Sequence, residues 1–430
     1  MSKWKKQKLL SLCKRIGDGL HGTPTYILDS DIYFINGNNL QDGKIIIDSE
    51  TKRVTEEVLK SNYVELNQYS LLLSINGTLG SMAFYNGEKV MLGKSAAYLN
   101  FKTAINKFYY YYFQLENIQK YFYHVATGST IKNLSLKSIQ DFEVPVPEQN
   151  EWLKIAAALS SLDNKIELNN KINAELEAMA KTLYDYWFVQ FDFPDENGKP
   201  YKSSGGKMVW NEVFKREIPE GWEVKNLGAI ENNIITGKTP PTNNSEFYNG
   251  DIPFITIGDI RGNMHVVKTE IKLTIAGGDI QKNKFIPDGS LCVTCIASPG
   301  LIGFATENSQ TNQQINSIIF SEKANRTYLY FVLCDFFKFA KGAKTGNTFA
   351  NMNKGDFEDI LLLNPSIEIK RRHHIKAEAI FDLILNNLKQ NQELSSIRDW
   401  LLPMLMNGQV SVGEAYEQVE KVLGMVAEPE

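Results

Sequence analysis

The sequence is poor in the side chains from which many catalytic sites and cross-links are built. Its 430 residues include four cysteines and five histidines. So few cysteines fit a reducing compartment and supply no disulfide framework. The apolar runs are far shorter than the roughly 18 residues that a membrane span needs, and no signal-peptide core follows the first residues. We therefore expect a cytoplasmic protein without membrane segments.

Two kinds of short motif resemble part of a metal site or of a phosphate-binding loop, but the other residues that such a site needs are missing. Cys292 and Cys295 lie in the strand-like run SLCVTCIA, where an odd separation puts two side chains on opposite faces. A structural zinc site takes four ligands, and no second pair of this kind is present. The tripeptides GKS (93–95) and GKT (237–239) lack the glycine that precedes a phosphate-loop Gly-Lys pair by five residues. We expect neither a metal site nor a nucleotide-binding loop.

A strong excess of positive charge is missing as well. The formal net charge is −4, with 17 Lys and Arg against 13 Asp and Glu in residues 1–147 and 13 against 14 in residues 221–366. Residues 148–192 carry 4 against 8. This is not the basic signature of a protein that grips nucleic acid unaided. It permits binding through local patches, and it hints that partner subunits contribute charge.

Two long segments show the apolar spacing of a coiled coil. From Pro147 to about Asp192, apolar residues recur in steps mostly of three and four, and a segment near the end of the chain repeats this spacing. Pro147 suits a first helical turn and Pro194 forbids continuation. A long helix with a narrow apolar seam needs a partner, so we expect the two to pair antiparallel, although separate packing on local cores stays open. The seam residues are Ile155, Leu159, Leu162, Ile166, Ile172, Leu176, Met179 and Leu183 in the first helix, and Ile380, Leu383, Leu394, Ile397 and Leu401 in the second.

The segments that precede the two helices repeat each other. The run IPFITIGDI corresponds to IYFINGNNL, and the run CIASPGLIGF corresponds to SINGTLGSMAF. The aromatic run TYLYFVLCDFFKFA corresponds to KFYYYYFQLENIQKYF, which is expected to be a helix. Matched glycines, such as Gly77 with Gly300 and Gly80 with Gly303, lie about 220 residues apart. The chain is therefore a tandem repeat of one globular domain followed by one long helix.

This repeat predicts an α+β protein. It consists of two similar mixed α/β domains separated by two long helices, which pair as an antiparallel coiled coil with pseudo-twofold symmetry. The expected segments are domain 1 (1–147), helix 1 (148–192), a connector (193–220), domain 2 (221–366), helix 2 (367–408) and a C-terminal tail (409–430).

Two similar domains at a fixed separation suit a bipartite target. Proteins with twofold symmetry bind duplex DNA in this way, and protein geometry then sets the half-site spacing. The two copies differ nearly everywhere outside their glycine and apolar framework. We therefore expect the two half-sites to differ, which makes the DNA target asymmetric.

A family resemblance supports this interpretation. The segments QNEWLKIAAALSSLDNKIELNNKINAELEAMAKTLYDYWFVQFDFPDENGKPYKSSGGKMVWNEVFKREIPEGWEV and SSIRDWLLPMLMNGQV resemble conserved regions of type I restriction-modification specificity subunits. The resemblance implies a non-catalytic subunit that recognises double-stranded DNA and docks two methyltransferase subunits and, through them, restriction subunits. It also implies that S-adenosylmethionine, ATP and Mg are bound by those partners, with no cofactor in this chain.

Two rival classes remain. A self-contained methyltransferase would need an Asn/Asp-Pro-Pro-aromatic loop and a Gly-rich cofactor loop, and the sequence has neither. For a nuclease, Pro194-Asp195 followed by Glu223 and Lys225 mimics a PD-ExK metal site, although Pro194-Asp195 lies in a polar connector. If the protein were a coiled-coil adaptor that binds only protein, the two divergent domains would have no function.

Base readout needs side chains that reach base edges from loops. The polar loop after each aromatic helix and the loop near the start of each copy are the candidates, together with Arg261, the only arginine near the IPFITIGDI run and a candidate guanine reader. The loop residues are Thr127, Ser129, Thr130, Lys132, Asn133 and Lys137, matched by Lys344, Thr345, Asn347, Thr348, Asn351 and Lys354, and then His21, Thr23, Tyr26, Lys238, Thr239, Asn243 and Asn244.

Overall fold

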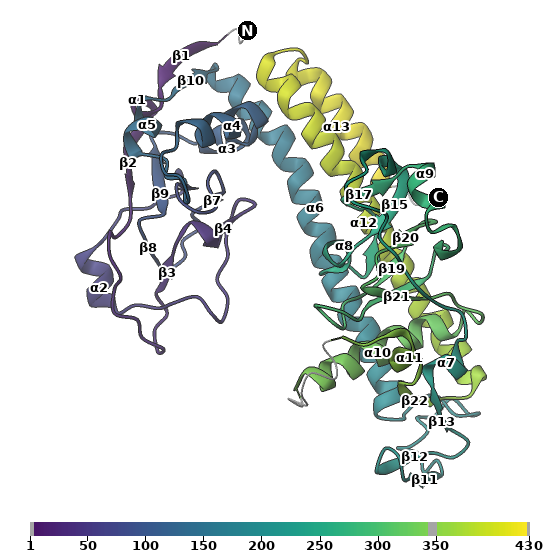
Figure 1. The fold of residues 1–430 in the computed structure, drawn as a ribbon. Helices are drawn as coiled ribbons and strands as arrows, with labels where there is room; N and C mark the ends of the chain where they lie inside the picture. Colours follow the sequence, from purple (N-terminus) through teal and green to yellow (C-terminus); the bar gives the residue numbers. More distant parts are fainter. Residues whose placement is uncertain (1–3, 343–350, 428–430) are drawn as a thin grey trace. The chain divides into compact units, whose positions relative to one another are not determined.

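The computed structural model describes residues 4–342 and 351–427, and the chain divides into two compact units. Unit 1 is Met1–Ile166 with Glu393–Glu430, and unit 2 is Glu167–Gln392. Each unit holds one globular domain and one end of both long helices, α6 (Gln149–Tyr184) and α12 (Ile367–Asn407) (Figure 1). The α+β architecture predicted from the repeat is confirmed.

In unit 1 the domain is built on an antiparallel sheet of four strands in the order β2-β9-β6-β7. The apolar run SLLLS forms the buried strand β6. Because side chains alternate between the faces of a strand, Leu71 and Leu73 enter the core cluster of the aromatic helix α3, whereas Leu72 enters a second cluster beside β3 and β8. The elements are β1 (Lys5–Lys8), α1 (Leu9–Leu12), β2 (Cys13–Asp18), β3 (Tyr33–Ile35), η1 (Gly37–Asn39), β4 (Leu40–Gln41), β5 (Lys44–Ile45), α2 (Glu56–Ser61), β6 (Ser70–Ser74), β7 (Met82–Phe84), β8 (Val90–Leu92), β9 (Ala96–Phe101), α3 (Asn106–Gln114), α4 (Glu116–Val125), α5 (Leu136–Asp141) and β10 (Glu143–Val146).

Unit 2 repeats this plan with additions. Its main sheet has the order β14-β21-β18-β19-β16, of which the first four strands repeat the unit 1 sheet, and β17-β15-β20 form a second sheet. Among the described residues, no helix is long and apolar enough to cross a membrane. The elements are β13 (Glu223–Asn226), α7 (Leu227–Ile230), β14 (Ile234–Thr236), η3 (Ser245–Phe247), β15 (Tyr248–Ile255), α8 (Ile257–Ile260), β16 (His265–Val266), β17 (Ile271–Leu273), α9 (Ile275–Asp279), η4 (Lys282–Lys284), β18 (Leu291–Thr294), β19 (Ile302–Ala305), β20 (Gln310–Thr311), β21 (Ile315–Ile318), α10 (Asn325–Gly342), α11 (Lys354–Glu358) and β22 (Leu361–Asn364).

Matched hydrogen bonds show which residues of the two domains correspond to each other. The hydroxyl of Tyr109 donates to the carbonyl of Pro145 at 2.9 Å, and the hydroxyl of Tyr328 donates to the carbonyl of Leu363. Each domain is closed by an antiparallel pair of its first and last strands, β1 with β10 and β13 with β22. Capping boxes begin η1 and α8 at equivalent positions. The internal repeat therefore extends to individual contacts.

The structure corrects the glycine alignment by three residues. The N–H groups of Gly80 and Gly300 donate to equivalent carbonyls, those of Ser74 and Thr294, at 2.9 and 2.8 Å. Gly77 therefore matches Ala297 rather than Gly300, and the two share a left-handed backbone with φ of 76° and 65°. The earlier pairing is wrong because the turn conformation is preserved in unit 2 without its glycine, at a cost in backbone strain.

Three segments differ from the sequence-based expectation. Helix α6 ends at Tyr184 and continues as the π-helical turn η2 (Asp185–Val189), and the left-handed φ of 66° at Phe191 ends the helical path before Pro194 is reached. The connector contains a hairpin of β11 (Met208–Asn211) and β12 (Arg216–Pro219). The C-terminal tail contains helix α13 (Val412–Ala427).

Asparagine side chains join the two long helices in unit 2. Asn169 donates to Asn391 Oδ1 at 2.9 Å, and Asn387 donates to Asn173 Oδ1 at 2.8 Å. Because the partner number falls as the α6 number rises, the helices are antiparallel there. In unit 1, Arg398 donates to a carboxylate oxygen of α6, that of Asp163, at 2.8 Å.

The predicted seam is partly wrong. Ile172, Met179 and Leu383 are 40%, 58% and 53% exposed. Asn169 and Asn173 are 1% and 5% exposed, so the seam runs through these polar residues, which the apolar pattern skipped, and turns Ile172 and Met179 outward. The remaining seam residues are buried (Ile155, Leu159, Leu162, Leu394, Leu401) or partly buried against a core (Ile166, Leu176, Leu183, Ile380, Ile397).

We expect Asn169→Ala to lower the free energy of unfolding by about 1–3 kcal/mol, because the Asn391 carbonyl oxygen loses its donor in a buried seam. Replacing Asn169 and Asn391 together by leucine removes both polar groups and should recover much of this loss. Chemical denaturation of the full chain measures both changes. Asn386→Ala, an exposed position on the same helix, is the control. Equal losses in the single and the double variant would contradict a role for the amide pair.

Candidate nucleic-acid interface

A series of backbone hydrogen bonds joins the two predicted loops of unit 1. The N–H of Leu20 donates to the carbonyl of Leu92 at 2.8 Å. The N–H of Ile75 donates to Ser95 at 3.0 Å, and the N–H of Leu134 donates to Ile75 at 2.9 Å. The loop after β2 and the loop after α4 therefore meet through the turn between β8 and β9 and the turn after β6. We call residues 19–26, 75–80, 92–95 and 126–137 the first loop cluster.

Unit 2 builds the same arrangement. The N–H of Lys238 donates to the carbonyl of Thr311 at 3.1 Å. The N–H of Cys295 donates to Gln314 at 2.8 Å, and the N–H of Met352 donates to Cys295 at 3.0 Å. We call residues 237–244, 295–300, 311–314 and 351–354 the second loop cluster. The backbone framework of the candidate interface is thus built twice.

Glycine makes the close contact at the start of each cluster possible. A Cβ at Gly19 would lie 1.9 Å from the carbonyl oxygen of Leu92, and a Cβ at Gly237 would lie 2.1 Å from that of Thr311. No side chain fits at such distances. These positions explain why the tripeptide GKT begins with glycine although it is no phosphate loop.

The loop after α4 presents polar side chains to solvent. Thr127 and Asn133 exchange backbone hydrogen bonds at 3.0 and 2.8 Å, which closes a tight loop over Gly128, whose φ is 102°. Ser129, Thr130, Asn133 and Lys137 are exposed, as base or phosphate contacts require. The ammonium of Lys132 lies 5.2 Å from the ring centre of Tyr123, which sequence reasoning missed because it belongs to the aromatic helix.

Other candidates of unit 1 already have partners within the domain. His21 Nε2 lies 2.7 Å from a carboxylate oxygen of Asp18. The ring of Tyr26 packs on Phe34 with centroids 5.8 Å apart. Thr23 is exposed in the same loop.

In unit 2 the candidates other than Thr239 and Arg261 divide into three groups. Lys238, Asn243 and Asn351 are exposed in the second loop cluster. Asn244 caps η3, and Lys354 pairs with Glu358 at 3.3 Å, so both have structural partners. Lys344, Thr345, Asn347 and Thr348 lie outside the described residues.

Arg261 does not share the hydrogen bonds that define the second loop cluster. It is exposed at the end of α8, where its N–H donates to the carbonyl of Ile257 at 3.2 Å. Its place in the repeat is that of Gln41, since each lies two residues after the capping box of its unit. Arg261 therefore lies in a part of the domain other than the second loop cluster, at the position that Gln41 takes in unit 1.

Sequence reasoning missed the residue at the centre of each cluster. Lys94 is exposed in the turn that joins the two loops of unit 1. Gln313 takes the equivalent position in unit 2, where its Oε1 accepts a hydrogen bond from Thr239 at 2.5 Å. The rejected GKS tripeptide contained Lys94, but only a pairing of distant loops could reveal its place.

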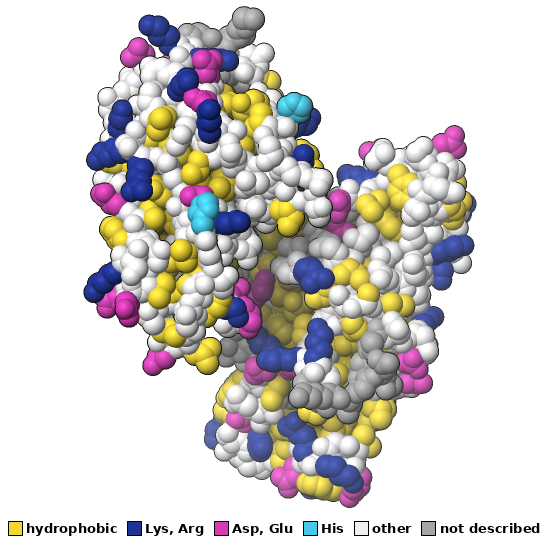
Figure 2. All heavy atoms as spheres, turned by 60° about the vertical axis from the view of Figure 1, so that its left-hand side comes forward, with side chains coloured by type: hydrophobic (Ala, Val, Ile, Leu, Met, Phe, Trp, Pro, Cys, Tyr) yellow, Lys and Arg dark blue, Asp and Glu magenta, His cyan; other side chains and the backbone are white. Residues whose placement is uncertain are grey.

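Figure 2 shows one face of the molecule, on which the lysine and arginine side chains lie among acidic and uncharged ones. No part of the described surface in that view is uniformly basic. This agrees with the charge counts of the sequence, and it favours local contacts over a single basic groove.

The remaining chemical motifs have structural roles. The Asp195 carboxylate accepts the N–H groups of Asn197 and Lys199, both at 2.8 Å, within a turn, and Lys225 pairs with Glu223 at 2.6 Å on one strand. These contacts do not assemble a PD-ExK site. In the described residues no group of three or more His, Cys, Asp or Glu side chains is placed to hold a metal ion.

The cysteine pair follows strand geometry. Cys292 and Cys295 enter separate core clusters on opposite faces of the sheet. Burial raises the pKa of their thiols to about 12 and about 11, so both stay protonated and unreactive near neutral pH.

Comparisons with known proteins agree on one family. A model described as the type I restriction modification DNA specificity domain matches residues 1–178 and 219–396, one segment for each repeat. The specificity subunit of the type I restriction enzyme HindI from Haemophilus influenzae is 32% identical over 342 residues, covering 68% of this chain and 74% of the relative. The MjaIX specificity subunit of Methanocaldococcus jannaschii is 27% identical over 395 residues, covering 89% and 88%. The crystal structure of a type I restriction-modification S subunit from M. genitalium shares the fold, with a TM-score of 0.56 and 16% identity over 94% of this chain and 96% of that chain.

Proposed function

Because this chain belongs to the type I restriction-modification DNA specificity family, we propose that each loop cluster reads one half of a bipartite, asymmetric DNA target. One observation carries the proposal. The same backbone hydrogen bonds build the loop cluster twice, while the side chains on it differ, as those of His21 and Thr239 do at matched positions. A repeated framework with different side chains suits two unlike half-sites.

The chain acts as a recognition subunit within a larger assembly. Its relatives are named as specificity subunits of type I restriction enzymes. We assign methylation to two methyltransferase subunits, which would bind S-adenosylmethionine, and cleavage to restriction subunits, which would use ATP and Mg. The first domain has only a modest excess of positive charge, 17 Lys and Arg against 13 Asp and Glu, and the second has none, with 13 against 14, which supports a division in which partners supply part of the phosphate contacts.

Reconstitution tests this function. The purified chain should neither methylate nor cut DNA, whereas the chain with its methyltransferase subunit and S-adenosylmethionine should methylate one bipartite sequence. Genomic methylation mapping identifies that sequence. Turnover by the chain alone, or methylation of a single contiguous half-site by the complex, would overturn the proposal.

Lys94 provides a test at one residue. We expect Lys94→Ala to weaken binding of the complex to target and non-target duplexes about equally, and to reduce the slope of log affinity against log salt by about 1, because a phosphate contact carries no sequence information. Salt titrations of duplex binding measure both effects. Lys107→Ala, which removes another exposed lysine of the same domain, is the control and should leave the slope unchanged. A loss confined to the target duplex would instead assign Lys94 to base readout.

A further inference from the structure

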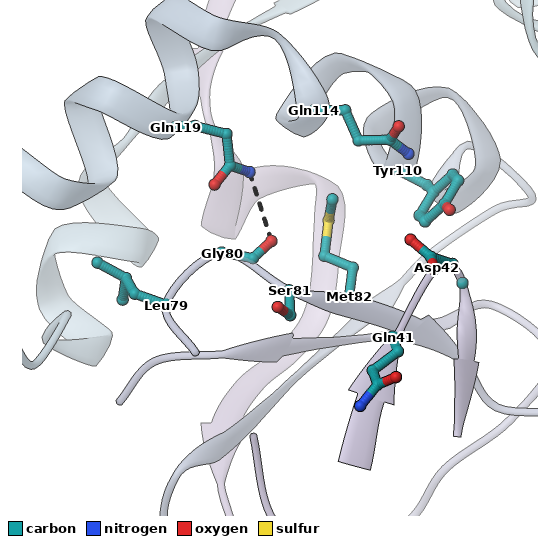
Figure 3. A pocket seen from close by; sticks show the side chains of 10 residues that line it. Gln41, Asp42, Leu79, Gly80, Ser81, Met82, Tyr110, Gln114 and Gln119 are labelled. Carbon is teal, nitrogen blue, oxygen red and sulfur yellow. Dashed lines mark hydrogen bonds between the residues drawn. The ribbon is translucent and has the colours of Figure 1, made fainter. Parts of the chain in front are cut away.

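A polar pocket with a volume of about 440 Å³ lies beside the first loop cluster (Figure 3). Its walls come from the β4–β5 turn, the turn before β7, and helices α3 and α4. The turn before β7 serves both features, because Leu79 and Gly80 line the pocket while Asn76 of the same turn pairs with Asn133 in the loop after α4. A ligand of that loop therefore has the pocket as its neighbour.

The polar groups of the pocket include the amides of Gln114 and Gln119 and the carboxylate of Asp42. Gln119 Nε2 is held by the carbonyls of Phe113 at 2.6 Å and Gly80 at 3.4 Å. Gln114 Nε2 is buried and makes no hydrogen bond of standard geometry among the described residues, although it lies close enough to the Tyr110 hydroxyl to lower the pKa of that group slightly. The carboxylate of Asp42, which only accepts hydrogen bonds, and the Gln114 amide lie around the ring of Tyr110 (Figure 3).

Tyr110 completes this wall as a neutral group. Burial first, and then the negative charges of Asp163 and Asp42, raise the pKa of Tyr110 to about 12. Its hydroxyl therefore stays protonated near neutral pH, and its ring supplies apolar surface beside the polar groups. Met82 lines the pocket as well.

The second domain shows that the fold does not require these polar groups. Asn106 and Asn325 begin α3 and α10, so Tyr110 corresponds to Leu329 and Gln114 to Leu333, both fully buried. A Cβ at Gly80 would meet the Gln119 side chain at 2.0 Å, whereas at Gly300 it would meet Phe337 at 2.4 Å. Apolar side chains thus take in unit 2 the places of Tyr110, Gln114 and Gln119.

We propose that this pocket binds one unpaired nucleobase of the DNA held by the first loop cluster, through its Watson–Crick edge. The inference rests on the proposed function. Every base carries an adjacent donor and acceptor on that edge, which match the Asp42 carboxylate and the Gln114 amide. A paired base has this edge occupied, so the base must leave its pair. A lysine or arginine side chain of a partner offers only donors and would leave the Gln114 N–H without an acceptor.

Free deoxynucleosides test the pocket without knowledge of the target. The full chain is titrated with each of the four deoxynucleosides and observed by ligand-detected NMR. We expect binding of at least one, and a loss of at least tenfold in affinity in Asp42→Asn and in Gln114→Leu. Asparagine tolerates the left-handed φ of 46° at position 42, and leucine is the residue that unit 2 has at the position of Gln114. Asp29→Asn, the same charge change at an exposed site of this domain, should bind as the unaltered chain does.

A second experiment tests the pocket in the assembled complex. Once methylation mapping has identified the target, 2-aminopurine is placed in turn at each position of the half-site read by the first domain. Apart from the methylated base, which the methyltransferase itself extrudes, its fluorescence should rise at one position in the complex, and Asp42→Asn should abolish that rise. No rise at any position other than the methylated base, with no deoxynucleoside bound, would overturn the pocket while normal methylation left the proposed function intact. A complex that methylates no duplex would overturn the proposed function, and the deoxynucleoside titration would still decide the pocket.

Discussion

Replacing Lys5–Val146 by the corresponding segment of a relative with a different target should change one half of the methylated sequence and leave the other half as it was. The physical reason is that this segment forms its own sheet and is closed by the pairing of β1 with β10. Each mismatched base pair costs about 1–3 kcal/mol, so a half-site with several mismatches should lose about 10³-fold or more in affinity. Methylation mapping of the reconstituted complex measures the change.

The structure sets the design of this exchange. The donor domain should keep a tyrosine at position 111, because the Tyr111 hydroxyl donates to Asp163 of α6 at 2.6 Å. The reciprocal exchange of Glu223–Asn364, bounded by β13 and β22, is the matched control and should change the other half. If either exchange altered both halves, independent readout by the two domains would be wrong.

Acidification from pH 7 to pH 5 should destabilise unit 2 by about 2 kcal/mol for each of two buried histidines. Burial first, and then the charge of Arg326, lowers the pKa of His265 from 6.5 to about 3, and burial first, followed by His374, lowers that of His373 to about 3. Between these values and 6.5 the unfolded chain binds protons that the folded chain does not. The contribution of these two histidines to the stability of unit 2 is therefore fully present above about pH 6.5, and it is lost progressively as the pH falls toward 3.

Urea denaturation at several pH values, followed by tryptophan fluorescence, measures this loss. Trp187 is a suitable reporter because its ring centroid lies 5.6 Å from that of His373. His265→Phe, in a site flanked by Phe304 and Phe381, should remove about half of the pH dependence, whereas His124→Gln at an exposed site should preserve it. An unchanged pH dependence in His265→Phe would show that this histidine is not the source.

Local patterns of the sequence determined the framework of this protein. Steps of three and four between apolar residues identified both long helices, since helical periodicity is a property of neighbouring residues. The repeated segments predicted two similar domains. Motifs long enough to be specific predicted the family. The loop after the first aromatic helix was also found in this way, because a polar run with glycine between two regular elements indicates a loop.

Only the tertiary structure decided which residues share a surface and which line a cavity. The seam passes through Asn169 and Asn173 because each amide meets a partner more than 200 positions away. Lys94 lies at the centre of the first loop cluster because distant backbone groups pair around its turn. Gln114 faces a pocket, although its equivalent in unit 2, Leu333, lies in a core. Hydrogen bonds and packing between segments far apart in the chain set these positions, and such pairings leave no periodicity in the sequence.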